Sequence, residues 1–251
     1  MQIQKLQEKD LTLFYSHAKE EQWDIEDIHI PTLLKTNPKD FFIFYENKKL
    51  LGYVVALKES EQFGFISSLL VLKEFRSLGY GKKILTVALK HLQNRQIALD
   101  SVLGQETFYE KFSFKRYFDV SYFKFIVGSV ALSQPKYDTI DFDAKLSLDG
   151  QSEYTKLLLQ NKNIHYKAIK SNNTISAFAF SFTYKDGYKI TLNAEDINEA
   201  ISLFFALTNN YKKNTNIYIQ VTRLSPILEA ITEALQMSEV SKMTRMYNKV
   251  L

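Results

Sequence analysis

The sequence predicts a protein of the α/β (α+β) class, built from two similar halves. Segments of high β propensity alternate with segments in which apolar residues recur every three or four positions, so strands and helices alternate along the chain. The first β-rich runs, 41–45 and 50–57, flank a short polar turn and predict an antiparallel hairpin. After a polar linker at 129–143, the same succession of strands and helices recurs. We therefore expect two mostly antiparallel sheets, each flanked by helices.

The composition indicates a globular protein and excludes several classes of site. Of the 251 residues, 45% are hydrophobic and 24% are charged, and no apolar run approaches the roughly 18 residues that would span a membrane. The opening residues resemble a strand rather than a secretory signal, so we expect a cytoplasmic protein without a membrane partner. The absence of cysteine excludes disulfides, thiolate metal sites and an acyl-cysteine intermediate. The net charge of +4 is mild and dispersed, so no nucleic-acid partner is expected.

The first strand is followed by two predicted helices with an acidic segment between them. Asp10 is a candidate N-cap for a helix in which apolar residues share one face: Leu11, Phe14, Tyr15 and Ala18. The acidic segment places Asp24 and Glu26 beside Trp23, the only tryptophan. Such a group can bind a cationic amine through charge and cation–π contact. In the alternative interpretation, the tryptophan belongs to the core and the carboxylates form a solvated rim.

The stretch from Gly64 to Arg95 predicts a strand, a glycine-containing loop and a helix, in that order. An apolar strand that includes Leu70, Val71 and Leu72 leads into Arg76-Ser77-Leu78-Gly79-Tyr80-Gly81, and a helix begins near Lys82. Glycine lets the backbone turn sharply and approach a ligand closely. The first N–H groups of a helix lack partners within the helix and attract anions. The stretch therefore predicts a site for a pyrophosphate, with positive charge added by Arg76, Lys82 and Lys83.

Two motifs together resemble those of a known superfamily. The spacing R-x-x-G-x-G differs from the phosphate loops of nucleotide-binding ATPases and dinucleotide-binding folds. It resembles the acyl-CoA loop of the GCN5-related N-acetyltransferase (GNAT) superfamily. Downstream, residues 108–114 resemble that superfamily's Y-x-K-x-G-F segment, with Tyr109 as the tyrosine and Ser113 in place of the usual glycine. An asparagine expected about seven residues before the tyrosine is replaced by Val102.

The resemblance implies a GNAT fold, a cofactor and a set of site residues. Residues 1–128 would form the acyltransferase domain, with the order β-α-α-β-β-β-α-β-α-β-β. Acetyl-CoA would be the cofactor, because the loop matches the superfamily's acyl-CoA loop. The cofactor-binding residues would then come from the strand end and the loop: Leu70, Val71, Leu72, Arg76, Ser77, Leu78, Gly79, Tyr80, Gly81 and Lys82.

The second half resembles a degenerate GNAT domain at 144–251. Where the first half has its glycine loop, the second has the run 193–198, which contains no glycine. Its two carboxylates, Glu195 and Asp196, would repel a pyrophosphate. Aligning the two halves also places Thr232 opposite Tyr109, so the second half would lack the proton donor. We therefore expect a single cofactor site in the chain.

The resemblance predicts direct transfer of an acetyl group to a primary amine. The two substrates would lie side by side in the gap where the fourth and fifth strands separate. Tyr109 would protonate the departing thiolate, unless it is a packing residue of a short helix. Asp24, Glu26 or Asp27 would take the proton from the amine, because serines occupy the strand position where a glutamate often lies in the superfamily. Backbone N–H groups near Leu70 and Leu72 would bind the pantetheine arm.

Other functions remain open at this point. The acceptor can be a small molecule or a peptide, since nothing in the sequence selects one. The chain can also be a non-catalytic acyl-CoA sensor. A transferase of tandem GNAT type that uses aminoacyl-tRNA is a third alternative, although such proteins need a basic surface. The four histidines show no paired spacing, so we expect no metal site.

Overall fold

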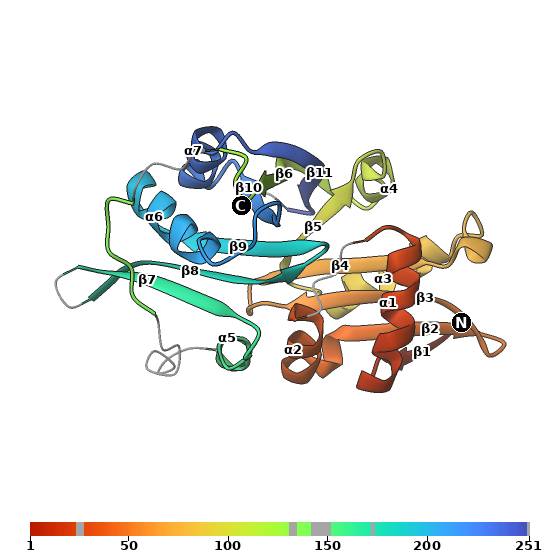
Figure 1. Ribbon diagram of the computed structural model, residues 1–251. Coiled ribbons are helices and arrows are strands. Elements are labelled where there is room, and N and C mark those ends of the chain that lie inside the picture. Colours follow the sequence, from red (N-terminus) through yellow and green to blue (C-terminus); the bar gives the residue numbers. More distant parts are fainter. Residues whose placement is uncertain (24–27, 131–134, 142–151, 172–173, 250–251) are drawn as a thin grey trace. The chain divides into compact units, whose positions relative to one another are not determined.

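The computed structural model describes residues 1–23, 28–130, 135–141, 152–171 and 174–249 (Figure 1). The chain forms two compact units. Unit 1 consists of Met1–Phe118 together with Thr244–Leu251, and unit 2 consists of Asp119–Met243. The chain passes from one unit to the other within β6 (Lys115–Ile126) and within β11 (Ser238–Tyr247). The end of the final strand therefore belongs to unit 1. The domain limits expected from the sequence, 1–128 and 144–251, remain a prediction.

Unit 1 contains a mixed, mostly antiparallel sheet. Its strands are β1 (Gln2–Lys5), β2 (Phe41–Glu46), β3 (Lys49–Lys58), β4 (Phe63–Val71) and β5 (Gln96–Val102). They lie in sequence order, followed by the end of β11. The first three pairings are antiparallel, as the predicted hairpin requires, and β4 pairs in parallel with β5. The α/β class with mostly antiparallel pairing is therefore confirmed.

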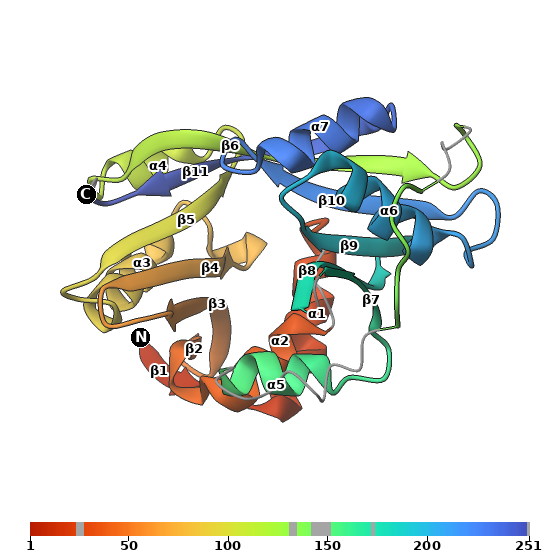
Figure 2. The same cartoon turned by 90° about the vertical axis from the view of Figure 1, so that its left-hand side faces the viewer.

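Helices cover both faces of the unit 1 sheet (Figure 2). They are α1 (Leu11–Glu20), α2 (His29–Thr36), α3 (Tyr80–His91) and the short α4 (Glu106–Glu110). Along β2 the side chains alternate, so Phe41 packs with α1 and α2 while Phe42 packs with α3. Ile84, Leu85 and Ala88 bury the expected face of α3. Burying the Ile84 and Leu85 side chains contributes about 1.5–3 kcal/mol each, which fixes α3 and its N-terminal loop to the sheet.

Two local expectations for unit 1 were wrong. The Asp10 side chain makes no capping hydrogen bond to α1, because its carboxylate accepts the Gln7 N–H at 2.9 Å instead. Residues 114–127 were expected to form more than one strand, but they form the single strand β6. The place beside β5 is taken by the end of β11, which explains why the first half supplies only one strand there.

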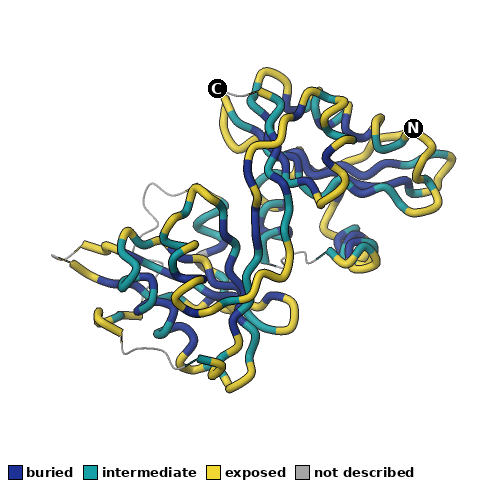
Figure 3. Tube along the Cα trace, turned by 90° about the horizontal axis from the view of Figure 1, so that it is seen from above, coloured by how far each residue is buried: buried dark blue, intermediate teal, exposed yellow. Residues whose placement is uncertain are grey.

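Unit 2 repeats this plan. It adds α5 (Glu153–Leu159), β7 (His165–Ser171), β8 (Thr174–Tyr184), β9 (Gly187–Asn193), α6 (Ile197–Thr208), β10 (Asn216–Thr222) and α7 (Pro226–Ala234). Its strands lie in the order β6-β10-β9-β8-β7, and only β9 and β10 pair in parallel. Helices α6 and α7 pack on one face of this sheet. Figure 3 shows that the strands contain many of the most buried positions in each unit.

In each unit the parallel strands pair over a short length and then separate. In unit 1 the pairing of β4 with β5 ends at Ile66 and Leu99, although β4 continues to Val71. Within this separating segment β4 has a bulge, where Ser68 and Leu69 together face Val54 of β3. Ser68 has φ of 53°, a left-handed conformation. Bulges of this kind redirect the backbone and often lie next to active sites.

Candidate active site

The glycine loop of unit 1 forms a cradle of backbone N–H groups. Gly79 has φ of 81° and is the N-cap of α3, and Ser77 also has a positive φ of 62°. A Cβ added to Gly79 would meet no atom within 4 Å, so glycine is required here for its conformation rather than for space. The first hydrogen bond of α3 joins the Lys83 N–H to the Gly79 carbonyl at 3.3 Å. The N–H groups of Tyr80, Gly81 and Lys82 are the helix's first donors, which suits a phosphate.

Gly81 differs from Gly79 in its surroundings and in its backbone conformation. A Cβ on Gly81 would lie 3.5 Å from Phe108 and 3.8 Å from Val71, which are ordinary packing distances. The residue thus lies where α3 approaches the segment that carries Tyr109, and it does not provide the sharp turn of the loop. Alanine would fit at this position, whereas the conformation of Gly79 disfavours any side chain.

Tyr80 and Lys83 extend the loop with polar groups from α3. The Tyr80 hydroxyl donates a short hydrogen bond to the Glu46 carboxylate at the end of β2, and this hydrogen bond raises the Tyr80 pKa. Lys83 lies over the Tyr80 ring, 4.9 Å from its centre. Leu78 is 62% exposed, so the tip of the loop projects into solvent. The loop is therefore held at its α3 end while its tip remains accessible.

The end of β4 offers one backbone edge to a ligand. The Leu72 N–H donates to the Leu51 carbonyl of β3 at 2.9 Å, so it is already used. Because N–H directions alternate along a strand, the Val71 N–H points to the side where β5 has moved away. The Val71 carbonyl on the same side accepts Arg76 Nε at 2.9 Å. Of Leu70, Val71 and Leu72, only Val71 therefore has its N–H on the side of β4 that β5 leaves open.

Tyr109 lies on α4 with its ring packed and its hydroxyl available. The ring contacts Phe108 and Phe114, with ring centres 5.0 and 6.2 Å apart. The structure records no hydrogen bond to the Tyr109 hydroxyl from the described residues. Burial raises the pKa of this hydroxyl to about 12, so Tyr109 is protonated at neutral pH. A protonated, unengaged hydroxyl can donate a proton to a leaving group.

The turn after α4 places a serine in a left-handed conformation. Ser113, which stands where glycine is usual, adopts φ of 67°. Its N–H donates to the Glu110 carbonyl at 3.0 Å, and the Phe114 N–H donates to the Tyr109 carbonyl at 3.3 Å. A non-glycine residue in this conformation costs roughly 1–2 kcal/mol.

Glu106 ties the first turn of α4 to its surroundings. Its side chain is 4% exposed, and its carboxylate accepts the Gly104 N–H at 2.8 Å and the Thr244 hydroxyl at 3.1 Å. These hydrogen bonds lower the Glu106 pKa, together with an internal one to its own backbone and the nearby Arg116 charge. Thr244 belongs to the part of β11 that completes unit 1. The position of Tyr109, one turn along α4, therefore depends on the end of the chain.

A second contact from β11 fixes the end of β5. Arg245 binds both oxygens of Asp100, with NH2 2.9 Å from Oδ2 and a shorter contact at Nε. The guanidinium also lies over the rings of Phe65 and Phe118. Asp100 lies just past the last β4–β5 pair, but this bidentate partner commits its carboxylate. Asp100 is thus a structural residue and a poor candidate for the general base.

The acidic segment that was expected to supply a base is only partly described. Asp24 and Glu26 lie outside the described residues. Trp23, three residues after α1, is partly buried against the core of α1 and α2. Its backbone N–H donates to the Ala18 carbonyl at 2.9 Å. This packing agrees with the core interpretation of the tryptophan. The assignment of Asp24 or Glu26 as base remains a proposal.

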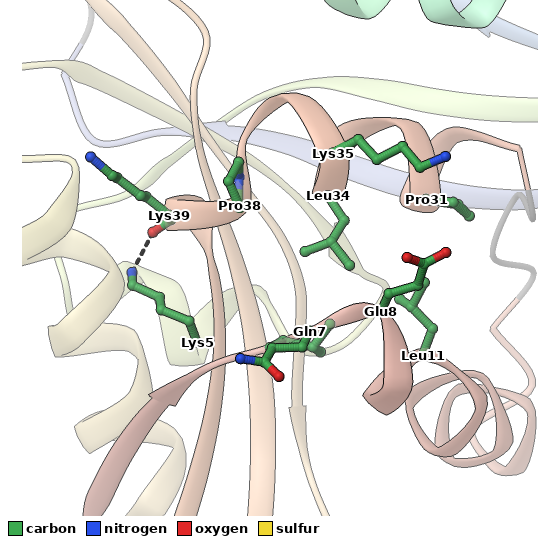
Figure 4. Close-up of a pocket in the computed structure, with 10 residues that line it drawn as sticks. Lys5, Gln7, Glu8, Leu11, Pro31, Leu34, Lys35, Pro38 and Lys39 are labelled. Atoms are coloured by element: carbon green, nitrogen blue, oxygen red, sulfur yellow. Dashed lines mark hydrogen bonds between the residues drawn. The ribbon is translucent and has the colours of Figure 1, made fainter.

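A separate cavity of about 430 Å³ lies at the other end of α1 (Figure 4). Leu11 and Leu34 form part of its apolar wall, and Lys35 and Glu8 lie at its rim. It opens near the first residue of α1, whereas Glu21 next to the last residue contacts the glycine loop. The length of α1, roughly 15 Å, separates the two places. This cavity is therefore not part of the glycine-loop site.

Unit 2 lacks the features of this site. Asp196 is the N-cap of α6, and its carboxylate accepts the N–H groups of Asn198 at 2.8 Å and Glu199 at 3.2 Å. The hydrogen bond from the Asn198 N–H lowers the Asp196 pKa, so the helix end already holds its own anion. Thr232 is buried, and its hydroxyl donates to the Glu229 carbonyl. Neither an empty phosphate cradle nor a free proton donor is present among these residues.

Two histidines, His17 and His91, form hydrogen bonds within unit 1. His91 Nε2 lies 2.7 Å from the buried Asp40 carboxylate, and His17 Nδ1 lies 3.0 Å from the Tyr53 hydroxyl. Within the described ranges, no three His, Asp or Glu side chains gather in a way that could hold a metal ion. Across those same ranges, no helix combines the length and the apolar character needed to cross a bilayer.

Comparison with known families accounts for both halves of the chain. Residues 2–114 match the model of the acetyltransferase (GNAT) family, and residues 143–250 match that of an acetyltransferase (GNAT) domain. The chain belongs to the GNAT superfamily. Because two matches follow one another, it is a tandem GNAT protein, and the family places it among the acyltransferases. The resemblance to the GNAT superfamily is therefore confirmed.

Solved structures and one curated relative are similar to this GNAT protein. A tandem GNAT protein from the clavulanic acid biosynthesis pathway superposes with a TM-score of 0.69 at 11% identity, covering 100% of this chain and 99% of its own. A candidate acetyltransferase of Pyrococcus horikoshii gives 0.74 at 12% identity, with 98% and 88% covered. Holothin acyltransferase of Pseudoalteromonas sp. (strain SANK 73390) is 24% identical over 101 residues, or 40% of this chain. The chain covers about a third of that relative's length, 34%.

Two residues near the candidate site were not predicted from the sequence. Glu21 forms an ion pair with Arg76, and Glu106 fixes α4. Both are acidic residues in amphipathic segments, where a carboxylate usually faces solvent. The signal for Glu106 was weak but present, because an acidic residue in the first turn of a helix is favoured by the dipole. Nothing in the local sequence of Glu21 indicated its partner.

Proposed function

We propose that this tandem GNAT protein is an N-acetyltransferase that uses acetyl-CoA and transfers the acetyl group directly to a primary amine. The observation that carries the proposal is the pairing, within unit 1, of the Gly79 cradle with the unengaged, protonated hydroxyl of Tyr109. The cradle would bind the cofactor's phosphates, and the Val71 edge would bind its pantetheine arm. The acceptor would be a small molecule or a peptide.

In this mechanism the residues of unit 1 bind, orient and move protons. The amine nitrogen attacks the thioester carbon, the carbon–sulfur bond breaks, and the thiolate receives the proton that Tyr109 donates. A carboxylate of the acidic segment, Asp24 or Glu26, takes the proton lost by the amine. Holding the two reactants in one geometry supplies much of the rate. The Val71 N–H can also stabilise negative charge on the thioester oxygen.

A thiol-release assay tests this proposal. The protein is incubated with acetyl-CoA and a panel of primary amines, small polyamines and peptides, and the released CoA thiol is measured with a thiol reagent. The chain contains no cysteine, so the protein itself adds no background. Longer acyl-CoAs in a parallel series determine the preferred acyl group. Release of thiol that depends on both an amine and the enzyme is the expected result.

A matched pair of variants makes the assay specific. Gly79→Val places a β-branched residue at φ of 81° and should prevent cofactor binding, whereas Gly128→Val changes a glycine of similar φ, 84°, outside unit 1. Binding of acetyl-CoA in calorimetry without thiol release for any amine would instead identify a sensor. Absence of both binding and release in the wild type would refute the proposal.

A further inference from the structure

Glu21 links the end of α1 to the cofactor loop. Its carboxylate oxygen Oε1 lies 2.6 Å from Arg76 NH2 and 3.8 Å from Lys73 Nζ. Lys73 also donates to the Glu20 carbonyl at 3.5 Å. The Glu21 side chain is 19% exposed, against 43% for Arg76, so the carboxylate is partly shielded from water. Two cations that flank the glycine loop thus converge on one carboxylate.

The ion pair with Glu21 engages the positive charge of Arg76, which a bound phosphate would need. Arg76 begins the loop, and its guanidinium is committed to the Val71 carbonyl through Nε and to Glu21 through NH2. A phosphate that enters the cradle meets a guanidinium whose charge is already balanced. It also meets the repulsion of Glu21 itself, and in a partly shielded place such interactions are stronger than in bulk water. The carboxylate therefore opposes the binding of an anionic ligand.

The comparison with unit 2 shows what distinguishes this carboxylate. Asp196 occupies the start of α6 from the adjacent position in the chain and hydrogen bonds to the backbone of its own helix. Glu21 lies more than 50 residues before Arg76 and makes its contact through a side chain on a different element. The Asp196 carboxylate is thus fixed to its own helix in unit 2, whereas in unit 1 a phosphate can replace the Glu21 carboxylate beside Arg76.

We propose that Glu21 is a positioning residue of the cofactor site, which holds Arg76 until a phosphate of the cofactor replaces the carboxylate. This inference rests on the proposed function, because it assumes that the loop binds acyl-CoA. On exchange, Arg76 turns its donors to the phosphate and Glu21 is released from the loop. The binding of cofactor is thereby coupled to the C-terminal end of α1.

Trp23 lies where it can report this exchange. It follows Glu21 by two residues, and both are held by the last turn of α1, since the N–H groups of Glu21 and Trp23 both donate to the Ala18 carbonyl. Between them Gln22 adopts φ of 58°, which forms a tight connection. As the only tryptophan, Trp23 gives the sole indole emission of the protein. Loss of the Glu21 contact should change its surroundings.

The test compares Glu21→Gln with Glu20→Gln by calorimetry, with coenzyme A as the probe. Both variants remove one negative charge at neighbouring positions, but Glu20 contributes only its backbone carbonyl to the loop. We expect Glu21→Gln to bind coenzyme A about two- to fivefold more tightly than Glu20→Gln, the range expected for a partly exposed ion pair. On an Arg76→Ala background the same substitution should raise the affinity by a smaller factor, because Glu21 then has no Arg76 charge to hold and only its direct repulsion of the phosphate remains.

Tryptophan emission provides the second measurement. Coenzyme A should shift the emission of the wild type, and Glu21→Gln should show most of that shift before ligand is added. Equal affinities for the two variants, or weaker binding by Glu21→Gln, would overturn the inference, and weaker binding would mean that Glu21 preorganises Arg76. If the wild type binds no coenzyme A, the proposed function itself fails. If it binds and the two variants behave alike, only the role of Glu21 fails.

Discussion

Replacing Tyr109 with phenylalanine tests the proposed chemistry most directly. The substitution keeps the ring, and therefore its contacts with Phe108 and Phe114, and removes only the hydroxyl. Because no hydrogen bond to that hydroxyl is recorded within the described chain, the free energy of unfolding should change by less than about 1 kcal/mol. A positioned general acid contributes roughly 10² to 10⁴ in rate. We expect kcat to fall within this range while the affinity for acetyl-CoA is unchanged.

The raised pKa of Tyr109 adds a condition on the pH profile. With a pKa of about 12, roughly 0.1% of the hydroxyl is ionised at pH 9. The acid is therefore fully available throughout the range in which kinetics are usually measured. The wild-type profile should show no loss of rate between pH 7 and 9 that Tyr109→Phe removes. A basic limb in this range that disappears in the variant would mean that the hydroxyl ionises far below pH 12.

Steady-state and single-turnover kinetics with saturating acetyl-CoA measure the effect, and calorimetry measures the affinity. Tyr137→Phe, which removes a more exposed hydroxyl in unit 2, is the matched control and should leave the rate unchanged. A fall of less than about threefold in Tyr109→Phe would refute the role of general acid. The thiolate would then leave unprotonated or take its proton from water, and Tyr109 would serve packing alone.

Four further predictions follow from other features. Ser113→Gly should stabilise the protein by about 0.5–1 kcal/mol, because glycine tolerates the φ of 67° that serine adopts there, and a lower midpoint in thermal unfolding would contradict this. Burial lowers the pKa of His91 below its usual 6.5 despite the nearby Asp40, so folding favours the neutral ring. The free energy of unfolding should therefore fall as the pH drops below about 6.5, and it should fall less in His91→Gln. Urea titrations of both proteins at pH 7.5 and 5.5 measure the difference. Met246→Ala should destabilise unit 1 by about 2–5 kcal/mol, because the Met246 side chain is fully buried in the same core as residues of α3 and β5. An unchanged urea midpoint would exclude this packing. Calorimetry of the full chain should give one equivalent of acetyl-CoA, since Asp196 occupies the corresponding helix end in unit 2, and two equivalents would contradict that reasoning.

Most of the fold was predictable from local patterns, because those patterns record burial. The face of α3 that packs on the sheet repeats every three or four residues, and the first hairpin shows β-rich runs on both sides of a polar turn. The wrong prediction for Asp10 arose because different backbone N–H groups can compete for one carboxylate. Asp10 was the expected cap of α1, and composition could not show that its carboxylate would instead accept the Gln7 N–H.

In the candidate site too, features carried by local motifs were predicted, whereas features that depend on distant residues were not. The glycine loop and Tyr109 were found because each is carried by a short, contiguous motif. The roles of Glu21 and Glu106 depend on partners that are 55 and 138 residues away, and a single sequence contains no signal for such pairs. The different duties of Gly79 and Gly81 also required coordinates, since only the φ of 81° and the approach of Phe108 separate them.

The discontinuity of unit 1 has a consequence for biosynthesis. Its first 118 residues are separated from Thr244 by the 125 residues of unit 2. At a synthesis rate of 5–20 residues per second, the ribosome needs roughly 6 to 25 s to make that intervening segment. During this time β5 is paired with β4 on one side only, and its other, unpaired edge can bind other chains. A nascent unit 1 would therefore need protection until β11 arrives, and products that terminate early would retain the glycine loop without the contact that holds α4.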